Sequence, residues 1–103
     1  MTFTVVTTPE ADEQIRAIDS WWRENRLAAP DLFSQELSEG FAVLEAIPHA
    51  GRGYEHPTVK NVRRTLLRST RYHVYYVVLG EVVTVLSVWS AVRGSGPDLK
   101  SPP

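Results

Sequence analysis

The sequence contains no cysteine among its 103 residues. This absence excludes a disulfide scaffold, thiolate zinc sites and cysteine nucleophiles, and it is compatible with a reducing compartment. Long apolar runs are also missing, since no stretch approaches the roughly 20 residues of a membrane span. The polar N-terminal segment MTFTVVTTPEADE does not have the pattern of a signal peptide. We therefore expect a single compact domain over residues 1–103 that makes no contact with a membrane.

Motifs for metals and cofactors are lacking as well. No pair of carboxylates or cluster of histidines has the spacing of metal ligands, and no glycine-rich loop of the phosphate-binding kind is present. The sequences GRG at 51–53 and GSG at 94–96 are too short to be nucleotide-binding fingerprints. The sequence therefore predicts neither a metal nor a cofactor.

Charge is unevenly distributed along the chain, although the net charge is only −1. Residues 1–51 carry nine acids and three arginines, which gives −6. Residues 52–103 carry eight basic residues and three acids, which gives +5. This asymmetry indicates two different electrostatic surfaces, of which the basic one would bind an anionic partner. The plainer interpretation is that two acidic helices precede a basic sheet.

The first half of the sequence has the pattern of a short strand followed by two helices. Residues 3–7 alternate like a strand, and Thr8 and Pro9 have the residue types of a helix start. A second helix is predicted from about Pro30–Asp31 to Pro48. The apolar stripes are Ala11, Ile15, Ile18 and Trp22 in the first helix, and Phe33, Leu37, Phe41, Leu44 and Ile47 in the second. Joined by a short linker, the helices should form an antiparallel hairpin.

The second half has the period of two that is typical of strands. Residues 48–57 are rich in turn formers and are predicted to be a surface loop. Strands are predicted at 62–67, 72–79 and 82–89, and Gly80-Glu81 fits a type II′ turn between the last two. The resulting fold class is α+β: an N-terminal strand and a helical hairpin packed on one face of a small antiparallel sheet.

The last two predicted strands are apolar on both faces, so the helical hairpin can cover only one of them. The second face must be closed by the C-terminal tail, by another copy of the chain or by a partner protein. We favour a partner, because Leu99 is the only large apolar residue of the tail. Residues 94–103 are expected to be irregular and flexible.

Several segments in this order resemble the RelE/ParE superfamily, the toxins of type II toxin–antitoxin modules, and the ParE branch more than RelE. The segments are Pro9-Glu10-Ala11, the loop residues Pro48, Gly51 and Arg52, and the runs VRRTLLR at 62–68, YHVYYVV at 72–78 and VWSAVRG at 88–94. The resemblance extends from about Phe3 to Leu99. Its specificity lies in the order and spacing of these segments, since each alone is common.

The resemblance implies a cytoplasmic bacterial toxin that inhibits growth, stabilises a plasmid or chromosome, and is neutralised by a ParD-like antitoxin encoded beside it. A heterotetramer or a larger toxin–antitoxin assembly is implied. For the ParE branch, the implied target is DNA gyrase, inhibited by protein–protein contact. For the RelE branch, the implied activity is ribosome-dependent cleavage of mRNA. A third reading is a decayed toxin that retains only its antitoxin-binding surface.

Basic residues concentrate between Arg52 and Arg93, and we expect them to contact the target or the antitoxin. The candidate contact residues are Arg52, Arg63, Arg64, Arg68, Arg71, Tyr72, His73 and Arg93. Because side chains alternate along a strand, Arg63 and Arg64 must point to opposite faces and cannot belong to one patch. The structural alternative is a charged sheet edge that prevents aggregation.

Catalysis of RNA cleavage would need a base, and arginine is nearly always protonated. The candidate bases are His49, His56, His73 and Glu81, although such histidines are more often structural. Many members of the superfamily carry a histidine at the position of Ser90, so this obvious acid or base is missing here. We therefore favour a non-enzymatic toxin, with no catalytic residue assigned and the ribonuclease as the alternative.

Overall fold

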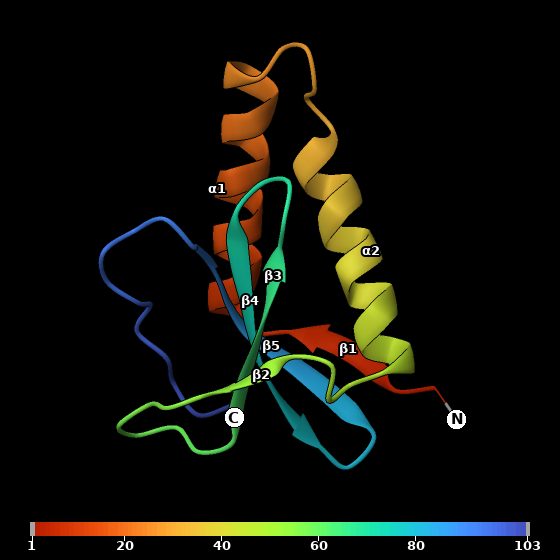
Figure 1. The fold of residues 1–103 in the computed structure, drawn as a ribbon, viewed down its shortest axis with the longest axis vertical. Helices are drawn as coiled ribbons and strands as arrows, with labels where there is room; N and C mark the ends of the chain where they lie inside the picture. Colours follow the sequence, from red (N-terminus) through yellow and green to blue (C-terminus); the bar gives the residue numbers. More distant parts are fainter. Residues whose placement is uncertain (1, 103) are drawn as a thin grey trace.

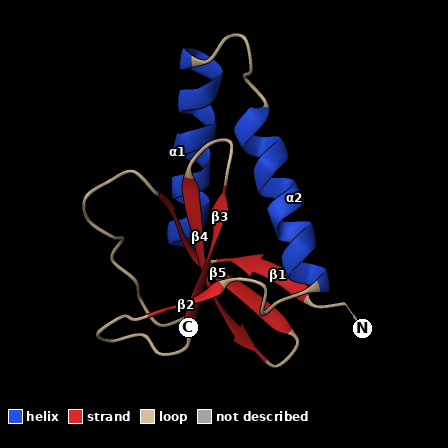
Figure 2. Ribbon diagram, viewed as in Figure 1, coloured by secondary structure: helices blue, strands red, loops and turns tan. Residues whose placement is uncertain are grey.

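Two helices stand side by side and pack against a five-stranded sheet (Figures 1 and 2). A computed structural model describes residues 2–102. In chain order the elements are β1 (Thr4–Thr7), α1 (Pro9–Asn25), α2 (Leu32–Ala46), β2 (Arg52–Tyr54), β3 (Val62–Leu67), β4 (Tyr72–Leu79) and β5 (Val82–Ser90). This order confirms the predicted α+β class. No helix within residues 2–102 is both long and apolar enough to cross a membrane.

The sheet has the strand order β1-β5-β4-β3-β2. Strands β2 to β5 pair antiparallel, whereas β1 pairs parallel with β5, with Val5 opposite Val83. The sheet is therefore mixed: the predicted antiparallel sheet is confirmed for β2 to β5, and the parallel pairing of β1 departs from it. The predicted loop at 48–57 also contains β2, whose Arg52 pairs with Arg64. A strand of three residues has too few alternations to be detected from sequence.

The hairpin of β4 and β5 agrees closely with its prediction. Leu79 pairs with Val82, which leaves Gly80 and Glu81 as the two-residue turn. Gly80 has a φ of 59°, as the first central position of a type II′ turn requires. Along β4, Val74 and Tyr76 face the helices, while Tyr75 and Val77 face the opposite side.

The main core lies between the helices and the sheet. The predicted apolar stripes supply Ala11, Trp22, Phe33, Leu37 and Leu44 as buried core residues, with Ile15, Ile18 and Phe41 packed against them. Ile47 is 59% exposed, so its assignment to the buried face was wrong. The helix ends at Ala46, and Ile47 has a φ of −135°, so its side chain no longer follows the helical stripe.

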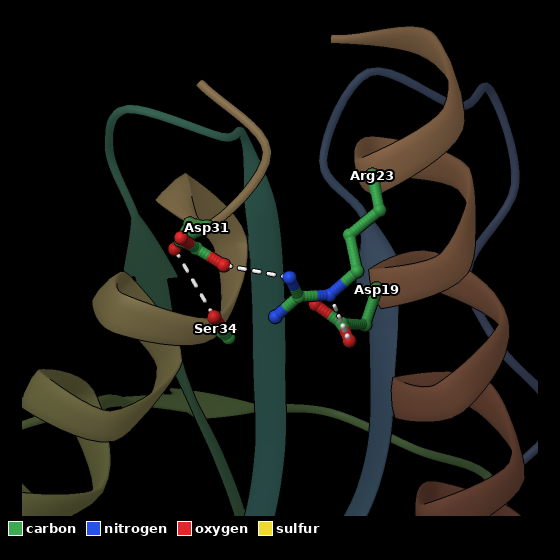
Figure 3. Close-up of polar contacts among 4 residues, drawn as sticks. All are labelled: Asp19, Arg23, Asp31 and Ser34. Atoms are coloured by element: carbon green, nitrogen blue, oxygen red, sulfur yellow. Dashed lines mark hydrogen bonds and ion pairs between the residues drawn. The ribbon is translucent and has the colours of Figure 1, made fainter. Parts of the chain in front are cut away.

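Polar contacts fix both ends of the helical hairpin. The Thr8 hydroxyl accepts a hydrogen bond from the Ala11 N–H at 3.2 Å, which confirms the predicted N-cap of α1. At the other end, Arg23 reaches from α1 across to the start of α2 (Figure 3). Its guanidinium lies 3.0 Å from the Asp19 carboxylate and 2.7 Å from that of Asp31. Because these groups are substantially exposed, the ion pairs stabilise the fold only modestly.

The second face of the sheet is covered by the chain itself. Tyr75, Val77 and Leu86 on this face are only 2%, 4% and 4% exposed. The covering residues are Val59, from the segment between β2 and β3, and Leu99, from the tail, with Tyr54 and Trp89 packed at the margin. We predicted that a partner protein would cover this face, and that prediction was wrong. Leu99 alone is too little to cover it, but Val59 and Tyr54 pack there as well.

The C-terminal tail crosses this second face without regular secondary structure, as predicted. The Trp89 Nε1–H donates a hydrogen bond to the Ser95 carbonyl at 2.9 Å. A Cβ at Gly96 would lie 2.7 Å from the Tyr54 hydroxyl, so any side chain there would displace the Tyr54 ring. The flexibility of 94–103 stays a prediction, and its last residue, Pro103, lies outside the described residues.

Replacing Leu99 with alanine tests whether the tail stabilises the fold. We expect Leu99→Ala to lower the free energy of unfolding by about 2–4 kcal/mol, because it removes a buried side chain and leaves a cavity. Val92→Ala, at a position 73% exposed, is the matched control and should change it by less than about 0.5 kcal/mol. Urea denaturation measures both, and equal stability of the two variants would contradict the tail's role as a cover.

Candidate functional site

The two consecutive arginines of β3 point to opposite faces, as predicted. Arg63 pairs with Tyr76 on the helix-covered face, and Arg64 pairs with Tyr75 on the other. The Arg63 guanidinium donates hydrogen bonds to the Gly51 carbonyl at 2.8 Å and to the His49 carbonyl at 3.4 Å. Arg63 is therefore occupied in holding the loop before β2, and it lies apart from the other candidate contact residues.

A basic pocket forms on the face turned away from the helices. It has a volume of about 400 Å³ and lies where β2, β3 and β4 meet. Its charged or titratable lining residues are Arg52, Arg64, Arg68 and His73, and Ala50, Gly51, Thr65 and Leu66 complete it. Pairing of Arg52 with Arg64, and of Leu66 with His73, brings these residues together from separate strands. Four of the eight predicted contact residues thus line one hollow.

Aromatic rings hold Arg64 in this pocket. Its guanidinium carbon lies 5.0 Å from the centre of the Tyr54 ring, and Nη1 donates a 3.4 Å hydrogen bond to the Tyr75 hydroxyl. The Tyr54 and Tyr75 rings pack edge to face with their centres 4.9 Å apart. Arg64 is half-buried, so its charge is presented from a fixed position.

His73 lies half-buried in the same pocket, opposite Leu66. Burial lowers the pKa of His73 below its ordinary value, and the positive charge of Arg64 lowers it further. The imidazole is therefore neutral at pH 7, and no acid lines the pocket to compensate the three arginines. Chemically, this arrangement suits binding of a carboxylate or a phosphate.

The backbone near Gly51 sets the position of Arg52 at the edge of the pocket. The Gly51 N–H donates a 2.9 Å hydrogen bond to the Tyr76 hydroxyl, while its carbonyl accepts from Arg63. Burial raises the pKa of Tyr76 above its ordinary value, against the opposing effects of this N–H and of Arg63. A Cβ at Gly51 would lie 2.5 Å from the Tyr76 hydroxyl and 2.8 Å from the Arg64 carbonyl. Only glycine fits there without displacing its neighbours.

Two further predicted contact residues lie beside a second, more apolar hollow of about 430 Å³. Tyr72 and Arg93 line it together with Trp21 of α1 and Trp89 of β5. The Arg93 guanidinium carbon stacks 4.5 Å from the centre of the Trp89 ring. The Tyr72 hydroxyl accepts a 3.1 Å hydrogen bond from Trp22 Nε1, which fixes the position of the Tyr72 ring in this hollow. Trp89 was missed from sequence, where it was only one apolar residue of a strand.

The remaining candidate, Arg71, lies exposed in the turn between β3 and β4. Its carbonyl accepts a 2.8 Å hydrogen bond from the Ala91 N–H, two residues before Arg93. Arg71 and Arg93 therefore lie at the same end of the sheet. Within residues 2–102, the two ion pairs present both belong to Arg23. The arginines at 52, 64, 68, 71 and 93 therefore carry charges that no described acid neutralises.

The candidate bases are not brought together. His56 Nδ1 accepts hydrogen bonds from the Val59 N–H at 3.1 Å and the Thr58 N–H at 3.3 Å, so this histidine caps a turn. His49 is exposed before β2, and Glu81 is exposed in the β4–β5 turn. Only His73 lies among the arginines.

Comparison with known proteins agrees with this architecture. Residues 5–93 match the family model described as ParE toxin of type II toxin–antitoxin system, parDE. No curated protein matched the sequence.

Three solved structures share the fold. The chromosomal ParDE toxin–antitoxin system of P. aeruginosa is similar at TM-score 0.65 and 20% identity, covering 86% of this chain and 96% of that one. The RelBE2 toxin–antitoxin complex of Mycobacterium tuberculosis gives 0.64 and 16%, covering 87% and 99%. A double arginine mutant of E. coli RelE in the free state gives 0.57 and 20%, covering 89% and 86%.

Substituting Gly51 tests the anchor of the basic pocket. We expect Gly51→Ala to lower the free energy of unfolding by about 1–3 kcal/mol, because the added methyl group overlaps Tyr76 and the backbone of Arg64. Gly53→Ala, two residues further along in β2, is the control, since its Cβ would meet nothing within 4 Å. Thermal unfolding of both variants measures the difference. A Gly51→Ala variant as stable as Gly53→Ala would refute the anchor.

The pKa of His73 can be measured by NMR titration of its ring protons. We expect a midpoint below the ordinary value of about 6.5, and Arg64→Ala should raise it. Because the unfolded chain takes up this proton at higher pH than the folded chain, His73 makes the protein less stable as the pH falls through that range. A midpoint at or above 6.5 would contradict the buried environment of the ring.

Proposed function

The chain belongs to the ParE toxin family of type II toxin–antitoxin systems, and on this basis we propose that it inhibits DNA gyrase by protein–protein contact and is neutralised by a ParD-like antitoxin. The observation that carries the proposal is the group of arginines at 52, 64, 68, 71 and 93, for which no described acid supplies an ion pair. Guanidinium groups without an acidic partner suit recognition of acidic side chains.

Shape and charge together support a protein partner. The basic pocket holds Leu66, which is 41% exposed, and the neighbouring hollow holds Trp21, which is 44% exposed. Large apolar and aromatic side chains beside arginines are typical of protein interfaces. The solved P. aeruginosa and M. tuberculosis structures are toxin–antitoxin systems, which supports an antitoxin partner here. We propose a heterotetramer or larger assembly in the bacterial cytoplasm.

A second candidate function, cleavage of mRNA on the ribosome, is favoured by one observation. His73 is a neutral imidazole among Arg52, Arg64 and Arg68, so a base lies beside groups that stabilise a charged phosphate. Burial limits the access of RNA to this base. The His73 ring is half-buried and packs edge to face on Tyr75, with the ring centres 5.9 Å apart. We rank the nuclease second for this reason.

Induced expression in a gyrase-proficient bacterium separates the two functions. Supercoiling of a reporter plasmid and integrity of total RNA are read from the same culture. Relaxed or broken plasmid with intact RNA supports gyrase inhibition. Degraded mRNA with normal supercoiling supports the nuclease, and growth unaffected by expression contradicts both toxic activities.

Removing three exposed arginines tests the contact surface. We expect the triple variant Arg68→Ala, Arg71→Ala and Arg93→Ala to lose growth inhibition while its thermal unfolding stays cooperative, because these side chains lie exposed. The matched control, Arg16→Ala with Lys60→Ala and Lys100→Ala, removes the same charge from other exposed positions. Growth inhibition retained by the first variant, or lost equally in both, would overturn the assignment.

A further inference from the structure

Glu36 of α2 makes three hydrogen bonds to the turn between β3 and β4. One carboxylate oxygen accepts from the Ser69 N–H at 2.7 Å. The other accepts from the Thr70 N–H at 2.9 Å and from the Thr70 hydroxyl at 2.6 Å. Bonds this short to a carboxylate are charge-assisted and stronger than neutral hydrogen bonds. A single side chain thus clamps two consecutive residues of the turn.

The charge of Glu36 is held by these donors and not by a cation. Both ion pairs found within residues 2–102 belong to Arg23. Burial raises the pKa of Glu36, but the hydrogen bonds from Thr70 and Ser69 outweigh it, so the pKa lies below its ordinary value. Glu36 is therefore a carboxylate at neutral pH. The same hydrogen bonds fix the position of the Glu36 side chain and that of the turn.

The clamped turn carries two of the unpaired arginines. Arg68 and Arg71 flank Ser69 and Thr70 directly. Arg71 has a φ of 68°, in the left-handed region that residues with a Cβ seldom adopt. Such a conformation persists where neighbouring contacts hold it. Here the Arg71 N–H donates to the Leu67 carbonyl, and the Arg71 carbonyl accepts from Ala91, each at 2.8 Å.

Close packing brings α2 within reach of the turn, which lies beside it in Figure 1. A Cβ at Gly40, one helical turn after Glu36, would lie 3.1 Å from Leu67 Cδ2 at the end of β3. Leu67 itself is only 4% exposed. The missing side chain at Gly40 therefore lets the helix lie close over the strand end.

We propose that Glu36 is a positioning residue that fixes residues 68–71 and thereby presents Arg68 and Arg71 as one contact surface. Through the bond between Arg71 and Ala91, the same clamp sets the start of the segment that carries Arg93. Glu36 acts through the turn and does not itself contact the partner. The inference rests on the proposed function in one respect, namely that these arginines bind a partner.

The first test is hydrogen exchange by NMR on Glu36→Gln, with Glu39→Gln on the exposed side of α2 as the control. Both variants remove one negative charge. We expect the amides of Ser69, Thr70 and Ala91 to exchange about 10-fold faster in Glu36→Gln. Core amides such as that of Val74 should change less than about 2-fold. Unchanged exchange at the turn, or equal acceleration throughout, would overturn the proposal.

The second test measures affinity for the proposed ParD-like antitoxin. We expect Glu36→Gln to weaken binding about 10-fold in the wild-type chain, but less than about 2-fold when Arg68 and Arg71 are already alanine. A purely structural role predicts equal losses in both backgrounds. If Glu36→Gln fails to fold, Thr70→Val replaces it, with Thr70→Ser as the variant that keeps the hydroxyl and restores binding.

These experiments separate failure of the inference from failure of the proposed function. A wild-type chain that binds no antitoxin would refute the partner, whereas the exchange measurement alone still decides whether Glu36 fixes the turn. Binding with equal losses in the two backgrounds would preserve the partner and refute the positioning role.

Discussion

Strands β4 and β5 are apolar on both faces, and this constraint determines the rest of the structure. The helical hairpin buries one face around Val74 and Tyr76. The other face, with Tyr75 and Leu86, needs a second cover, because apolar groups left in water oppose folding. The chain supplies Val59 and Leu99 for it from two irregular segments. A fold of this size therefore uses its loops and tail as part of the core.

The chain covers the centre of the second face but leaves part of it open near Leu66, which is 41% exposed. The basic pocket lies in this open part, where β2, β3 and β4 meet, and the aromatic hollow lies between α1 and the end of β5. The alternation that buries Tyr76 also directs Arg63 to the loop carbonyls, while Arg64 remains beside the pocket. Strand alternation thus gives two adjacent arginines different roles. Their roles follow from the face of the sheet on which each side chain lies.

Local sequence patterns predicted the elements that rest on local interactions. The β4–β5 hairpin follows from a period of two and one glycine, and the start of α1 follows from Thr8 and Pro9. Features that depend on pairing between distant parts of the chain were not predicted. The parallel pairing of β1, the short strand β2 and the burial of Val59 are set by residues distant in sequence. The basic pocket was not predicted for the same reason, since Arg52 and Arg64 meet only through β2.

The residues that hold the site differ in kind from those that would bind a partner. Gly51, Tyr76 and Arg63 join by buried or half-buried hydrogen bonds. Glu36 joins the turn by two half-buried hydrogen bonds from Thr70 and one exposed hydrogen bond from Ser69. The arginines at 68, 71 and 93 are exposed, so their loss removes little that the fold requires. Polar groups in low dielectric are costly when left unpaired, which makes the holding residues sensitive to substitution. Stability and recognition are therefore separable here by mutation, because one set of polar groups faces inward and the other faces solvent.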